Sequence, residues 1–104
     1  MCKQISTEYL LGSILYFRPE GVTISDLNIF EQNVYNQTAD LILDISRSAI
    51  IAVLESYAEY FKFENDILRL SNFYLNNMER IKSRFVDVLD SSIMEAMQTA
   101  LISI

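Results

Sequence analysis

Two pairs of carboxylates are spaced as acid-base or metal chemistry would require. Asp40 and Asp44 lie four residues apart, and so do Glu55 and Glu59. Residues four apart share one face of a helix, so each pair could act on one substrate or hold one metal ion. A di-metal carboxylate bundle also uses Glu-x-x-His motifs, however, and the sequence contains no histidine. We therefore interpret both pairs as solvated acids.

The other common routes to catalysis and cofactor binding also lack their residues. Without histidine, neither a Ser-His nor a Cys-His nucleophile pair can form. Gly12 and Gly21 are isolated, so neither begins a glycine-rich phosphate loop, and the region around Asp40 has no glycine for a calcium loop. The single cysteine, Cys2, allows no intrachain disulfide and no cysteine-based zinc site. The sequence predicts a non-enzymatic protein with no catalytic, cofactor-binding or metal-binding residues.

Arg80 and Arg84 form the basic feature that we weigh as a binding site. They lie one helical turn apart and can present two guanidinium groups together, to a phosphate or to the acids of a partner. Lys82 would point to another side of the same helix. The alternative is a solvated helix face, and the nearby acids Glu79 and Asp87 favour it.

Aromatic residues supply the second candidate for partner binding. Rings are common both in protein cores and at the centres of interfaces, and we favour the core for most of this set. A tyrosine can lie at a buried margin with its hydroxyl in water. We therefore predict that Tyr57, Tyr60 and Tyr74 join Arg80 and Arg84 as the partner-binding residues.

Charge is distributed unevenly along the chain, whose net charge is −6. Between residues 19 and 61 there are seven acids and a single basic residue, Arg47. Between residues 62 and 84 there are five basic residues and three acids. The first segment should repel phosphate, so any anion-binding surface must lie in the second. Nucleic acid is a disfavoured partner for this reason.

The sequence predicts that helices position these candidates. The 104 residues suit a single domain, and after Gly21 there is no glycine or proline, although these residues usually punctuate strands and tight turns. We expect an all-α, bundle-like domain of four to five helices. Capping boxes are expected at Thr23 with Asp26 and at Ser92 with Glu95. The predicted helices cover residues 7–17, 23–36, 39–60, 71–89 and 92–104.

Two of these segments need separate comment. The 39–60 segment carries apolar residues on all sides, so we predict that it is the central helix, covered by the other helices and by a second copy of the chain. Residues 61–70 fit either a helix or a two-residue β-hairpin with Phe61, Phe63, Leu68 and Leu70 on one face. We favour the helix there.

These observations rank the functions of the chain. The first is a small acidic helical interaction module (an adaptor, chaperone or inhibitor) that forms a homodimer and presents an apolar surface to a protein partner. The alternative is a dimeric DNA-binding transcriptional regulator of winged-helix type, with residues 23–36 inside a helix-turn-helix and 61–70 as the wing. No apolar run is long enough to span a membrane, and we expect a cytoplasmic protein.

Overall fold

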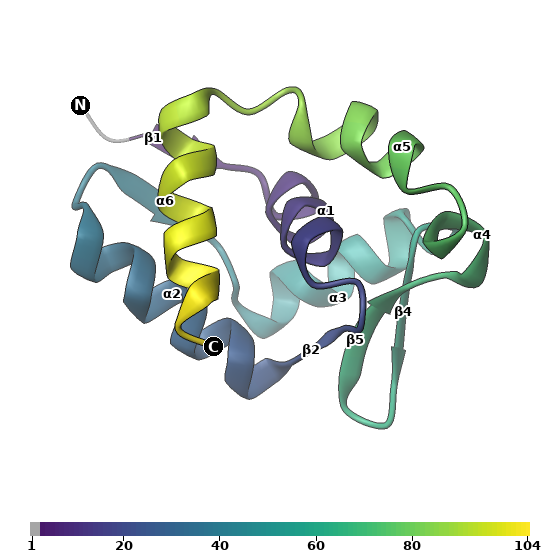
Figure 1. Ribbon diagram of the computed structural model, residues 1–104. Coiled ribbons are helices and arrows are strands. Elements are labelled where there is room, and N and C mark those ends of the chain that lie inside the picture. Colours follow the sequence, from purple (N-terminus) through teal and green to yellow (C-terminus); the bar gives the residue numbers. More distant parts are fainter. Residues whose placement is uncertain (1–2) are drawn as a thin grey trace.

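The computed structural model describes residues 3–104 as a chain of short helices and strands (Figure 1). Strands β1 and β3 pair in parallel, and β2, β5 and β4 form an antiparallel sheet in that order. The predicted all-α bundle is therefore wrong, and the fold is mixed α/β. The elements are β1 (Lys3–Ile5), α1 (Thr7–Phe17), β2 (Val22–Thr23), α2 (Ile24–Gln37), β3 (Leu41–Leu43), α3 (Arg47–Ser56), β4 (Phe61–Glu64), β5 (Ile67–Leu70), α4 (Asn72–Leu75), α5 (Met78–Ile81), the π-helical turn η1 (Lys82–Val86) and α6 (Ser91–Ile102).

Helix α1 occupies the centre of the molecule. Its residues Leu10, Leu11, Ile14 and Leu15 have no exposed surface, because α3, α5, η1 and α6 pack around it. Figure 1 shows α1 enclosed by these elements. The helix that we predicted as central, over residues 39–60, does not exist as one element.

The 39–60 segment contains a strand followed by a separate helix. Leu41 and Leu43 are buried while Ile42 between them is exposed, which is the alternation of a strand, and this strand pairs with β1. Helix α3 starts afterwards, where the hydroxyl of Ser46 accepts a hydrogen bond from the backbone N–H of Ala49. A continuous apolar run has no period that separates a strand from a helix, so the pattern misled the prediction.

Residues 61–70 form the hairpin, the alternative that we considered less favourable. Phe61 lies opposite Leu70 and Phe63 opposite Leu68 in the β4–β5 ladder. The turn residues Asn65 and Asp66 have φ angles of 54° and 63°, the left-handed values that a tight two-residue hairpin turn needs. Asn and Asp adopt this conformation more readily than most non-glycine residues, so the absence of glycine did not prevent the turn.

The predicted helix over residues 71–89 is also divided, into α4, α5 and η1. The π-helical turn η1 lies against α1, where the ring of Phe85 packs over Gly12. The hydroxyl of Ser13 donates a hydrogen bond to the carbonyl of Phe85 at 3.3 Å. A small residue and a hydroxyl on α1 therefore allow the wider turn to approach closely and satisfy one of its carbonyl groups.

The helices α1 and α2 follow the prediction closely. The capping box at the start of α2 is confirmed: Asp26 N donates to Thr23 Oγ1 at 3.0 Å, and Thr23 N donates to the Asp26 carboxylate at 3.1 Å. These two bonds satisfy N–H groups that the first turn leaves free. They also fix the point where β2 passes into α2.

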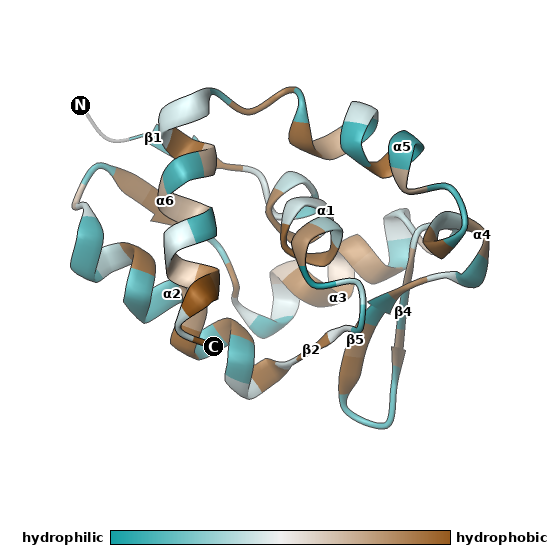
Figure 2. Ribbon diagram, viewed as in Figure 1, coloured by the Kyte–Doolittle hydropathy of each residue, from teal (hydrophilic) through white to brown (hydrophobic). Residues whose placement is uncertain are grey.

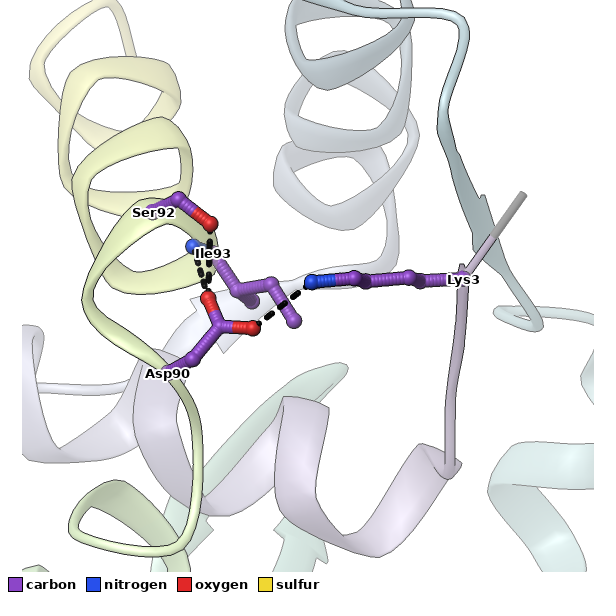
Figure 3. A network of polar contacts seen from close by, with 4 residues as sticks. All are labelled: Lys3, Asp90, Ser92 and Ile93. Atoms are coloured by element: carbon purple, nitrogen blue, oxygen red, sulfur yellow. Dashed lines mark hydrogen bonds and ion pairs between the residues drawn. The ribbon is translucent and has the colours of Figure 1, made fainter. Parts of the chain in front are cut away.

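The start of α6 differs from the prediction, because Asp90 caps it instead of Ser92. One Asp90 carboxylate oxygen accepts bonds from Ile93 N at 3.0 Å and Ser92 Oγ at 2.7 Å (Figure 3). The other oxygen lies 2.9 Å from Lys3 Nζ. These bonds hold the pKa of Asp90 well below its usual range, and the bond from the Ser92 hydroxyl has the largest effect. A carboxylate there also suits the positive end of the helix dipole.

The elements α1, β2, α2, α3, β4 and β5 follow one another in this order, and we call the β4–β5 hairpin the wing. The connection between α2 and α3 is longer than a simple turn because it contains β3. Helix α6 packs across α2 as an addition to this arrangement. Within residues 3–104, no helix is both long and apolar enough to cross a membrane.

Candidate functional site

A groove lies between α2, α3 and the wing. Its cavity volume is about 930 Å³. Figure 2 shows apolar residues along α3 and on both wing strands, the elements that form two of its walls. We call it the α3–wing groove. Its apolar lining consists of Ile24, Leu43, Ile45, Ile50, Ile51, Leu54 and Phe63.

Several of these apolar side chains are unusually exposed. Ile24, Ile51 and Phe63 expose 40%, 44% and 41% of their surface. They come from α2, α3 and β4 and meet at one place, so they form a patch rather than scattered surface residues. Contiguous apolar surface of this kind marks sites of interaction with other molecules.

The charged residues around the groove are mostly acidic. Glu31, Asp44 and Asp66 line it together with a single base, Arg47. Within residues 3–104, none of these four side chains lies within 4.0 Å of an opposite charge. The groove therefore combines an apolar floor with a net negative rim, and its potential favours a cationic ligand.

The chain holds the floor of the groove in place with bonds from distant elements. Thr7 Oγ1 donates to the carbonyl of Asp44 at 2.8 Å, which ties the segment before α3 to the start of α1. The hydroxyl of Tyr35 donates to the carbonyl of Leu43 at 3.3 Å and accepts a hydrogen bond from Leu43 N at 3.4 Å. These bonds make the groove a preformed feature of the fold.

Sequence reasoning did not assign these groove residues to a site. The signal was present in the apolar residues on every side of the 39–60 segment, which we interpreted as a central helix covered by other helices. Ile50 and Ile51 both line the groove, but Ile50 is buried in the core whereas Ile51 exposes 44% of its surface. Only the position of the wing opposite α3 separates these roles.

Four of the five predicted partner-binding residues do come together, in a second pocket beyond the carboxyl end of α3. Tyr60, Tyr74, Arg80 and Arg84 line this cavity of about 490 Å³, with Glu79 and Ser83. We call it the Tyr–Arg pocket. Tyr57 does not line it, although its ring centroid lies 6.2 Å from that of Tyr60.

The tyrosine rings of this pocket stack on each other. The centroids of Tyr60 and Tyr74 are 4.4 Å apart with 25° between their planes. A hydrogen bond from the Tyr74 hydroxyl to Tyr60, followed by partial burial, raises the pKa of Tyr74. A hydrogen bond to the same Tyr60 hydroxyl raises the pKa of the Arg84 guanidinium.

Lys82 and the carboxylate pairs lie elsewhere. Lys82 points away from the pocket and pairs with Asp87 at 3.0 Å. Asp40 and Asp44 flank β3 instead of sharing a helix, and Glu59 lies beyond the end of α3, so neither carboxylate pair has the assumed geometry. Within residues 3–104, no three histidine, cysteine or carboxylate side chains gather as a metal site would require.

The surface of α3 is poorly suited to reading DNA. A recognition helix contacts bases through Arg, Lys, Asn or Gln, and among the residues of α3 only Arg47 belongs to these types. The wing carries the acids Glu64 and Asp66 near its tip, and its Arg69 pairs with Glu64 at 3.3 Å. The acids would repel the phosphate backbone.

Comparison with known proteins gives no relative from which a function could be transferred: no protein-family model, curated protein or solved structure matches this chain.

Proposed function

We propose that this chain is a winged-helix domain that binds a protein partner through the α3–wing groove. The observation that carries the proposal is the composition of this surface. An exposed apolar floor and unpaired acids occupy the place where a DNA-binding winged helix would need basic and amide side chains. The domain acts as an interaction module and not as an enzyme.

The groove fits a partner segment of definite chemistry. Ile51 and Phe63 offer apolar contacts on opposite walls, so the segment should insert at least one aliphatic or aromatic side chain between them. Glu31, Asp44 and Asp66 would pair with lysine or arginine residues on either side of that anchor. An amphipathic helix with basic flanks meets both requirements.

The self-association that we expected remains a proposal, with one restriction. Two copies facing each other through the groove would bring their acidic rims together, which is unfavourable. A homodimer would therefore use another face, and the groove would stay free for the partner. We extend the proposal to action in the cytoplasm, which suits a chain with a single cysteine.

DNA binding by a dimer is the second candidate, because the order of elements is that of a winged helix. It would depend on Arg47 at the start of α3 and on Lys62 of the wing, neither of which pairs with an acid within residues 3–104. The surplus of acids around them weighs against it.

A peptide-display selection with the full chain as bait tests the proposal. We expect the selected peptides to share an apolar anchor flanked by Lys or Arg. Ile51→Glu should weaken their binding about tenfold or more, because it places a charge in the apolar floor. Glu31→Gln should weaken binding less and reduce its dependence on salt, since it removes one rim charge.

The matched control is Val88→Glu. Val88 exposes 58% of its surface but does not line the groove, so this variant should bind the selected peptides normally. Titration of duplex DNA provides the other arm. Tight DNA binding that weakens with rising salt and is lost in Arg47→Ala would support the DNA-binding regulator. Peptide binding that is unaffected by Ile51→Glu would refute the α3–wing groove as the binding site.

A further inference from the structure

We propose that the Tyr–Arg pocket binds a phosphate monoester through Arg80 and Arg84. Within residues 3–104, neither guanidinium lies within 4.0 Å of a carboxylate, whereas Lys3, Arg18 and Arg69 each have an acidic partner. Within the same residues, Arg47 and Lys62 also lack an acidic partner, but Arg80 and Arg84 are two such cations that line one pocket, in a chain of net charge −6. Their mutual repulsion would be relieved by a bound anion.

Aromatic rings hold the two guanidinium groups in place. The Cζ atom of Arg80 lies 5.7 Å from the ring centroid of Phe73, and that of Arg84 lies 5.7 Å from the centroid of Phe85. Such contacts orient a guanidinium over a ring without using all of its five N–H donors. Part of the entropy lost on binding an anion is thus already lost in the free protein.

The donors in the pocket match a phosphate better than a carboxylate. Besides the two guanidinium groups, the pocket contains the hydroxyl of Ser83 and that of Tyr60. Each of these two hydroxyl groups can donate one hydrogen bond to a ligand. A phosphate monoester has three terminal oxygens and up to two negative charges, so it can use several donors at once.

The electrostatic balance of the pocket also permits an anion. Glu79 is the one acid among its lining residues, so the two arginines leave a net positive charge.

The core of the molecule supports the pocket. Arg80 lies on α5 and Arg84 on η1. The Phe85 ring and the hydrogen bond from Ser13 to the Phe85 carbonyl anchor η1 to the buried helix α1. π-Helical turns occur frequently at functional sites. The pocket is therefore supported by the core.

The test is an NMR titration of the isotope-labelled full chain at constant ionic strength, with phenyl phosphate, inorganic phosphate and benzoate as probes. We expect phenyl phosphate to shift the signals of Arg80, Arg84 and Tyr74 along one saturating curve. Arg80→Gln and Arg84→Gln should each weaken this binding about tenfold, as expected for loss of a charge-assisted hydrogen bond. Arg69→Gln, which changes an arginine outside the pocket, should leave it unchanged.

The outcomes separate the sources of the phosphate and the ways in which the proposal fails. Phenyl phosphate binding more tightly than inorganic phosphate indicates an ester or phosphorylated side chain, whereas equal binding indicates the free ion. Equal binding of benzoate, or equal shifts at Arg47 and Arg69, would overturn the phosphate site. If a Gln variant loses its folded spectrum, Arg84→Lys keeps the charge, removes the planar fork and should still weaken binding.

Discussion

At the scale of single residues, Gly12 shows how one position determines a helix contact. It lies within α1, where glycine is an unfavourable helix residue by about 1 kcal/mol relative to alanine. The close approach of Phe85 requires it, because a Cβ atom at this position would overlap the Phe85 side chain. Packing against η1 therefore outweighs the local preference of the helix.

We predict that Gly12→Ala destabilises the domain by about 1–3 kcal/mol, the usual effect of overpacking a filled core. The helix preference alone would give a gain of about 1 kcal/mol, so the two effects differ in sign. Urea unfolding followed by circular dichroism measures the difference. A variant as stable as the parent, or more stable, would show that Phe85 does not lie against Gly12.

Asp90 makes stability depend on pH. Its carboxylate accepts bonds from Ser92, Ile93 and Lys3, and these bonds hold its pKa below the ordinary value of 3.8. A lowered pKa in the folded state stabilises the fold above the ordinary pKa, and this contribution is lost as pH falls further. The effect is modest because the side chain is exposed.

We therefore expect the difference in melting temperature between the parent and Asp90→Ala to be largest near neutral pH and to shrink below about pH 4. Asp90→Asn should retain most of the stability, since Asn also caps helices well. A difference that stayed constant from pH 7 to pH 2 would contradict the role of the ionised carboxylate.

At the scale of elements, the β4–β5 wing depends on a turn with two left-handed residues. Asn65 and Asp66 adopt this conformation at some energetic expense, and Asn-Gly is the preferred pair for such a turn. The turn also sets the position of Phe63 in the α3–wing groove, because it fixes the register of β4 against β5. Stability of the turn and geometry of the groove are thus linked.

We predict that Asp66→Gly stabilises the domain by up to about 1 kcal/mol by removing the left-handed strain. The same change removes one acid from the groove, so binding of the basic peptides described above should weaken. Thermal unfolding and peptide titration of the same variant measure the two effects. Loss of stability would indicate that the turn is of another type.

At the scale of the whole molecule, Arg18 ties the end of α1 to the end of the chain. Its guanidinium donates hydrogen bonds to the carbonyl groups of Leu101, in the last turn of α6, and of Ile104, beyond the end of that helix. The partly buried side chain thereby holds α6 across α2. This contact joins residues more than 80 positions apart in the sequence.

Replacing Arg18 by Met should destabilise the domain by about 1–3 kcal/mol, the range for losing hydrogen bonds to a charged group. Hydrogen exchange should accelerate first in the last turns of α6, while the amides of α1 stay protected. Arg69→Met is the control, because Arg69 pairs with Glu64 on the exposed face of the wing. Uniform acceleration over the whole chain would mean that α6 does not open separately.

The sequence by itself determined those features that depend on nearby residues. The capping box of Thr23 and Asp26 located the start of α2, and the helix predicted over residues 7–17 coincides with α1. The composition also indicated that basic residues gather between residues 62 and 84. Four of the five predicted partner-binding residues share one pocket, and the fifth, Tyr57, does not line it.

The tertiary structure decided everything that depends on partners distant in the sequence. Strand β3 exists because β1 lies beside it, and a three-residue strand has too short a pattern to be distinguished from a helix. Residues 61–70 form a hairpin instead of a helix because β2 pairs with β5 and because Phe61 and Leu70 are buried in the core. The α3–wing groove likewise results from packing, since whether Ile50 or Ile51 is buried depends on which elements lie against α3.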